Sequence, residues 1–144
     1  MKSSRLLVAA LATLALLSGA YAAENPSVLI PGYEKISAAL VADNCRDAKS
    51  AAQELAEEAT QGHENRIAAA AQAVAKAADL TAAREAFKQL SVDIIPVARH
   101  QAGHFIVNCP MANADWVQSN RKIANPYFGA AMSSCGSVTE ETKG

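Results

Sequence analysis

The chain has 144 residues, of which 13 are basic and 14 acidic, giving a formal net charge of −1 at pH 7. This length is sufficient for one domain with a modest core. The near-neutral charge and the lack of any basic cluster argue against nucleic acids and anionic membrane surfaces as partners.

The N-terminal segment has the pattern of a secretory signal peptide. Two early basic residues precede an apolar run of 12 residues, Leu6 to Leu17, and the small residues that a signal peptidase requires end at Ala22. The run is shorter than the roughly 20 residues that a membrane-spanning helix needs. The sequence therefore predicts a signal peptide over residues 1–22 and a periplasmic or secreted mature chain over residues 23–144, with no membrane span.

Between residues 26 and 98, apolar side chains recur at intervals of three and four residues, which predicts amphipathic helices. The expected helices are one ending near Asp43-Asn44, one capped by Asn44 and ending at Gly62, one through Ile67 to Ala78, and one from Asp79 or Thr81 to Ala98. Short turns between such helices favour an up-and-down bundle. The predicted fold is therefore all-α, a single small helical-bundle domain of about four helices, with Pro96 expected to kink or end the last helix before the histidines.

The segment over residues 100–136 is rich in Pro, Gly, Asn, aromatic and sulfur-containing residues, and we expect it to be a loop-rich Cys/Met segment. Trp116, Tyr127 and Phe128 are expected to supply core that the alanine-rich helices lack. Asn125 and the proline after it predict a tight turn that directs the following Cys/Met residues.

Sulfur ligands suggest a metal site in this segment. Cys109 and Met111 flank a proline, and Met132 and Cys135 are three residues apart, so that both can face one point from a single helical turn. Thiolate and thioether ligands select soft ions such as Cu(I), whereas Mg²⁺ and Ca²⁺ require carboxylates and carbonyls. We predict a copper(I) or silver site formed by Cys109, Met111, Met132 and Cys135, with His104 as a further ligand.

Two alternatives remain open at this point. His100 and His104 lie on one helix face only if the helix persists beyond Pro96. Cysteines of an exported domain also commonly form disulfides, and a Cys109–Cys135 bridge would make the chain a non-catalytic structural or interaction module of the cell envelope. Three cysteines allow at most one bridge within the chain, and Cys45, at a helix start, is expected to be a small buried filler.

No enzyme is expected. The sequence contains no C-x-x-C, no haem-attachment motif, no G-x-S-x-G, no H-E-x-x-H and no glycine-rich phosphate loop.

The C-terminal part of the sequence resembles the pattern CPMA, W, NPYYG, M, CG. The matching positions are the run Cys109-Pro-Met-Ala, Trp116, the run Asn125-Pro-Tyr-Phe-Gly, Met132 and the pair Cys135-Gly. This pattern is found in an uncharacterised bacterial periplasmic domain, which occurs alone behind signal peptides or fused to periplasmic adaptor subunits of copper and silver efflux systems. The resemblance extends upstream through Asp79, Arg84, Phe87, Leu90 and Ser91. It implies metal handling, with a periplasmic efflux adaptor as partner. The pattern includes the four sulfur residues Cys109, Met111, Met132 and Cys135. It does not include His100, His104 or Cys45.

Overall fold

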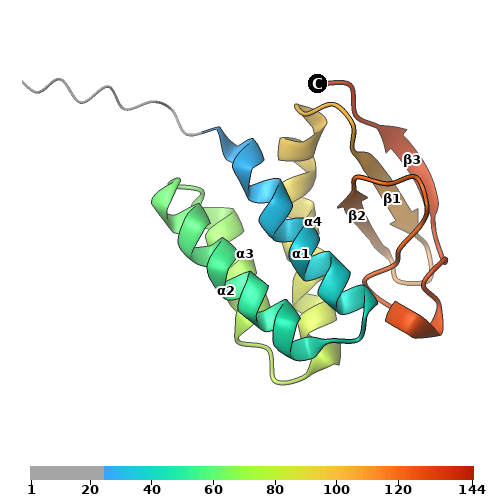
Figure 1. Cartoon of the computed structure of the whole chain (residues 1–144), viewed down its shortest axis with the longest axis horizontal. Coiled ribbons are helices and arrows are strands. Elements are labelled where there is room, and N and C mark those ends of the chain that lie inside the picture. Colours follow the sequence, from blue (N-terminus) through green and yellow to red (C-terminus); the bar gives the residue numbers. More distant parts are fainter. Residues whose placement is uncertain (1–24) are drawn as a thin grey trace, which may run out of the picture.

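The computed structural model describes residues 25–144, so the predicted signal peptide over residues 1–22 lies outside the described residues. Four helices pack side by side, and a small sheet lies against one side of them (Figure 1). The elements are η1 (Pro26–Val28), α1 (Leu29–Val41), α2 (Cys45–Gln61), α3 (Asn65–Ala75), α4 (Leu80–Arg99), β1 (Phe105–Cys109), β2 (Ala114–Gln118), η2 (Gly129–Ala131) and β3 (Ser137–Glu141).

The helical part of the prediction is confirmed. Asn44 accepts a hydrogen bond from the Asp47 backbone N–H at 3.1 Å and so caps α2, and Gly62 follows the last residue of that helix. Asp79 caps α4 in the same way, accepting from the Ala82 N–H at 2.8 Å. These side chains satisfy backbone donors that have no partner within the helix. Consecutive helices contact each other and α1 closes against α4, as in an up-and-down bundle.

Helix α4 ends before the two histidines, so the alternative in which His100 and His104 lie on one helix face is not the one formed. The helix continues past Pro96 and ends at Arg99, where His100 forms the C-cap. The His100 N–H bonds to the Val97 carbonyl at 3.2 Å, which closes the last turn. His100 and His104 therefore do not share a helix face.

The all-α prediction was wrong, because the segment after α4 forms a three-stranded antiparallel sheet in the order β2-β1-β3. Phe105, Ile106 and Val107 make a short run of aromatic and β-branched residues that is buried in β1. Such a run suits a pleated, buried strand. Asn113, with φ of 49°, ends the turn that joins β1 to β2, and the chain is accordingly a mixed α/β fold dominated by helix.

An aromatic layer joins the sheet to the helices. Tyr33 of α1 stacks on Phe87 of α4 with ring centroids 4.8 Å apart, and Trp116 of β2 meets the Tyr127 ring edge-on at 5.9 Å. Trp116 is fully buried and Tyr127 is 6% exposed. Their predicted role in the core is confirmed, while Phe128 is only partly buried.

Tyrosine hydroxyls also close the outer edge of β2 against the bundle. The Val117 N–H donates to the Tyr33 hydroxyl at 3.2 Å, and the Tyr127 hydroxyl donates to the Asp115 carbonyl at 2.6 Å. Both hydroxyls also contact Ser91 Oγ of α4, at 2.7 and 3.1 Å. An edge strand would otherwise leave such backbone groups unpaired, so this network fixes the sheet on the helices.

Within residues 25–144, no helix is long and apolar enough to cross a membrane.

Candidate functional site

The structure brings Cys109 and Cys135 together. Their Sγ atoms lie 3.0 Å apart, although 26 positions separate the two residues in the chain. Cys109 is the last residue of β1, and Cys135 precedes β3, which pairs with β1 down to Asn108 opposite Ser137. The strand pairing therefore delivers both cysteines to the same end of the sheet. We refer to these two residues as the cysteine pair, and both are free thiols in the structure.

The turn after β1 shapes the environment of Cys109, which is fully buried. Burial alone raises the pKa of the Cys109 thiol, but hydrogen bonds outweigh burial and lower this pKa below its usual value. The donors are the Cys135 thiol, the backbone N–H groups of Ala112 and Met111, and the Asn125 side chain. Its hydrogen bond to Cys109 raises the pKa of Cys135. Cys109 is therefore the first of the pair to ionise.

Asn125 holds the segment that carries Cys135. It is fully buried, and its side-chain N–H donates to the Cys135 carbonyl at 2.6 Å. Its side-chain oxygen accepts from the N–H groups of Tyr127 and Phe128, at 2.8 and 3.2 Å, which makes the tight turn predicted for this residue. The prediction that the turn directs Cys135 is supported by the first of these contacts.

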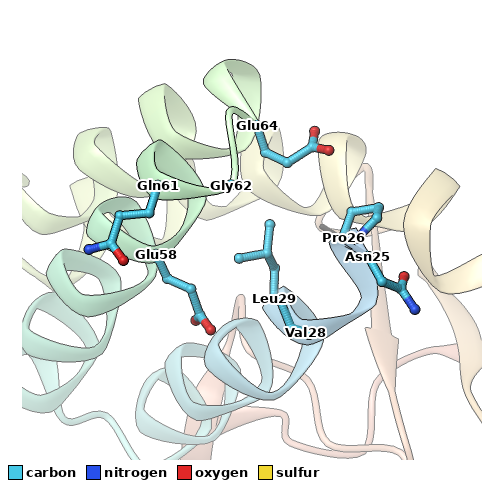
Figure 2. Close-up of a pocket in the computed structure, with 8 residues that line it drawn as sticks. All are labelled: Asn25, Pro26, Val28, Leu29, Glu58, Gln61, Gly62 and Glu64. Carbon is cyan, nitrogen blue, oxygen red and sulfur yellow. The ribbon is translucent and has the colours of Figure 1, made fainter. Parts of the chain in front are cut away.

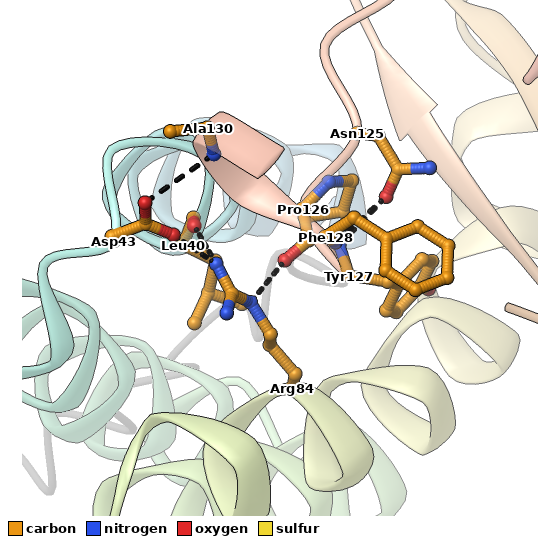
Figure 3. A network of polar contacts seen from close by, with 8 residues as sticks. All are labelled: Leu40, Asp43, Arg84, Asn125, Pro126, Tyr127, Phe128 and Ala130. Carbon is orange, nitrogen blue, oxygen red and sulfur yellow. Dashed lines mark hydrogen bonds and ion pairs between the residues drawn. The ribbon is translucent and has the colours of Figure 1, made fainter. Parts of the chain in front are cut away.

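Arg84 ties that turn to the bundle (Figure 3). From α4, its guanidinium donates to the Pro126 carbonyl at 3.0 Å and to the Leu40 carbonyl at 2.8 Å. It also pairs with Asp43, whose carboxylate accepts from the Ala130 N–H at 3.3 Å. The Arg84 hydrogen bond, helped by the Ala130 N–H, lowers the pKa of Asp43. One arginine thus joins the end of α1, the start of α4 and the turn that positions Cys135.

Of the two predicted methionine ligands, the structure places one at the pair. Met111 Sδ lies 4.0 Å from Cys135 Sγ, and the Met111 side chain is 68% exposed. Met132 is half-buried at the C-cap of η2, and its carbonyl accepts from the Cys135 N–H at 3.1 Å. Among the described residues, no hydrogen bond joins Met132 Sδ to either thiol.

The predicted histidine ligand lies elsewhere. His104 directly precedes β1 and Cys109 ends it, so about 16 Å of extended strand separates them. His104 is held through its backbone to Thr142, and its buried Nδ1 has no hydrogen-bond partner in the described part of the chain. Cys45 is the first residue of α2 and is only partly buried, whereas we expected a small buried filler there.

The donor set of the site is therefore two thiols and one exposed thioether. Within the described residues, no group of three or more His, Cys, Asp or Glu side chains is arranged to hold a metal ion. A four-ligand site of the zinc type is thus not formed by these residues. Two thiolates with a thioether suit soft ions that accept few ligands, and two adjacent thiols equally suit a disulfide.

A separate surface cleft of about 280 Å³ lies between the start of α1 and the turn from α2 to α3 (Figure 2). Leu29 forms part of its wall, and the carboxylates of Glu58 and Glu64 lie on either side. None of the site residues predicted from the sequence lines it.

Sequence reasoning missed two residues that build the site. Gly136 lets the Cys135 segment approach the sheet, because a Cβ there would lie 2.7 Å from a Trp116 ring carbon. Arg84 was noted only as part of the upstream resemblance. The signal that could have identified it is its spacing, four residues after Leu80 and three before Phe87 on the apolar face of the predicted helix, since an arginine on such a face requires partners.

A search of curated proteins and a search of solved structures each found no match. A family model described as "Protein of unknown function (DUF3347)" matches residues 29–103, just over half of the chain. The match covers the bundle and ends before the cysteine pair. The chain belongs to this DUF3347 family of proteins of unknown function.

Proposed function

We propose that this chain binds a soft monovalent metal ion, Cu(I) or Ag(I), between Cys109 and Cys135, with Met111 as a third ligand. The observation that carries the proposal is the convergence of three sulfur atoms, with Sγ to Sγ at 3.0 Å and Sδ to Sγ at 4.0 Å. Soft sulfur ligands favour Cu(I) over hard ions. Met132 and His104 are not part of this proposal, because among the described residues no hydrogen bond joins either side chain to the cysteine pair.

Protonation supports binding by the pair. A metal-bound thiolate must lose its proton, and the hydrogen bonds around Cys109 already favour its ionised form. Cys109 is thus the first of the pair to lose its proton, and the ion must also displace the proton of Cys135. Affinity should fall as pH is lowered, because both sulfur atoms become protonated.

Access to the site supports a role in transfer of the ion. Met111 is exposed and lines a surface cleft of about 240 Å³ beside α4. An ion that arrives from solvent can contact Met111 and Cys135 before it reaches the buried Cys109. The thioether is the weaker ligand, so it is the contact through which the ion exchanges, while the thiolates hold it.

The biological setting is part of the same proposal. The signal-like N-terminus supports a location in the periplasm or outside the cell, and the sequence resemblance supports a link to heavy-metal efflux through a periplasmic adaptor protein. In that setting the chain sequesters the ion or passes it to the adaptor.

A competition titration tests the proposal. The reduced mature chain is titrated anaerobically with Cu(I) against a chromophoric chelator, and one ion per chain is expected. Cys109→Ala and Cys135→Ala should each weaken binding by at least about 10–100-fold, the loss typical of disturbing a metal's supporting shell. Cys45→Ser, which removes the third thiol, is the matched control and should bind normally. Equal affinity in all three variants would remove the cysteine pair from metal binding.

A further inference from the structure

The two thiols of the cysteine pair differ in their access to solvent. Cys109 is fully buried at the end of the central strand, whereas Cys135 is partly exposed. The neighbour of Cys135 on the open side is Met111, which is 68% exposed. Of the two residues, Cys135 is therefore the one that a reagent in solution meets first.

The pair is also held at a reacting distance. The Sγ atoms are 3.0 Å apart, about 1 Å more than a disulfide bond. The backbone of Cys135 is fixed by the Asn125 side chain and by its bond to the Met132 carbonyl. Cys109 is fixed by its place at the end of β1, where it pairs with Ala114 of β2. Little backbone movement is needed for the two sulfur atoms to bond.

We infer that the cysteine pair is a reversible dithiol that reacts in a fixed order, with Cys135 as the entry thiol for a low-molecular-weight disulfide and Cys109 as the resolving thiol. Cys135 passes its proton to the hydrogen-bonded Cys109 sulfur, 3.0 Å away, and attacks one sulfur of the small disulfide, forming a mixed disulfide and releasing one small thiolate. Cys109 then gives the proton to the released thiolate and attacks Cys135 Sγ, forming the Cys109–Cys135 disulfide and releasing the second small thiolate. The chain gives up two electrons and two protons, and the small disulfide takes them up as two thiols.

This reaction needs no metal and does not depend on the proposed metal binding. Excess small thiol drives it in reverse, so the bridge is not a permanent staple. If the metal proposal also holds, the reaction has a regulatory consequence. An oxidised pair offers no thiolate to the ion, so oxidation of the pair closes the metal site.

Cys45 must be removed before the order can be measured. It lies at the first position of α2, is partly exposed and forms no bond with the pair in the described structure. It would form its own adduct with a small disulfide and obscure the result. The parent protein for the experiment is therefore Cys45→Ser.

The experiment treats metal-free protein with oxidised glutathione and follows the intact mass. The Cys45→Ser parent should lose two hydrogens without accumulating an adduct. Adding Cys109→Ala should leave one lasting glutathione adduct, on Cys135, because no thiol resolves it. Adding Cys135→Ala instead should leave the protein unmodified over the same period. An adduct on Cys109 in that last variant, or a lasting adduct in the parent, would overturn the order.

A second measurement does not depend on how the variants fold. The Cys45→Ser parent is quenched with acid at early times, and the transient adduct is located by peptide mass spectrometry. Glutathione on Cys135 supports the proposal. Glutathione on Cys109, or a bridge that forms without any adduct on Cys135, contradicts it.

Discussion

Gly136 determines how closely the segment that carries Cys135 approaches the sheet. Its φ is +140°, a conformation that side chains rarely adopt. A Cβ at this position would lie 2.7 Å from a Trp116 ring carbon and 3.1 Å from the Asn108 carbonyl oxygen. The sequence shows a glycine after Cys135, but not the strand pairing that places Trp116 and Asn108 against it. The physical need for glycine was therefore visible only in the structure.

We predict that Gly136→Ala lowers the free energy of unfolding by roughly 2–4 kcal/mol, because backbone strain and overpacking add. Gly103→Ala is the matched control, since Gly103 has φ of +88° but nothing within 4 Å of its would-be Cβ. It should cost only about 1–2 kcal/mol. Urea denaturation measures both values. Equal losses in the two variants would show that the contact with Trp116 has no energetic role.

At the scale of elements, the helices could be predicted and the sheet could not. The helices repeat their apolar positions over several turns and carry local caps such as Asn44 and Asp79, so their signal lies within each segment. Each strand has only five residues. The partner of β1 in β3 lies about thirty positions away, and β3 alternates exposed and half-buried residues without a strong apolar run. The short run at Phe105 was the one local signal of a strand.

The tyrosine network that closes β2 makes the stability of the fold depend on alkaline pH. Burial raises the pKa of both Tyr33 and Tyr127 well above the usual value of about 10. In the unfolded chain both ionise near pH 10, whereas the folded chain keeps both protons. The folded state thus binds more protons above this pH, and stability is lost as pH rises further.

We predict that the free energy of unfolding is insensitive to these two groups below about pH 9.5 and falls above pH 10 by up to about 1.4 kcal/mol per pH unit for each tyrosine. Tyr33→Phe should halve that slope. It should also lower stability at neutral pH by about 1–3 kcal/mol, because the buried Val117 N–H loses its acceptor. Urea titrations at several pH values measure both effects. An unchanged alkaline slope in Tyr33→Phe would contradict this account.

On the scale of the whole molecule, the chain combines an alanine-rich bundle with a sheet that supplies large side chains. Alanine buries little apolar area per residue, so the bundle gains stability from the aromatic layer, to which β2 contributes Trp116 and the turn after it Tyr127. The family match over residues 29–103 covers this bundle. The cysteine pair lies beyond it, on the sheet, and Arg84 connects the two parts through the Pro126 carbonyl.

The candidate site could be predicted in composition but not in geometry. Soft side chains concentrated in one segment predicted that Cys109, Met111 and Cys135 lie close together, and the structure places them so. The positions of Met132 and His104 depend on the direction of β1 and on how η2 ends. The first is a property of the sheet and the second of the connection from β2 to β3, and the sequence revealed neither. Spacing along the chain therefore placed Met132 and His104 in the expected site without showing where the sheet positions them.

X-ray absorption spectroscopy at the copper edge tests the central claim most directly. Reduced mature protein is loaded with one equivalent of Cu(I) without oxygen, and the scattering atoms around the ion are identified. The account predicts a shell of sulfur atoms alone, from Cys109, Cys135 and Met111. A shell that contains nitrogen or oxygen atoms, such as an imidazole from His104, would contradict it.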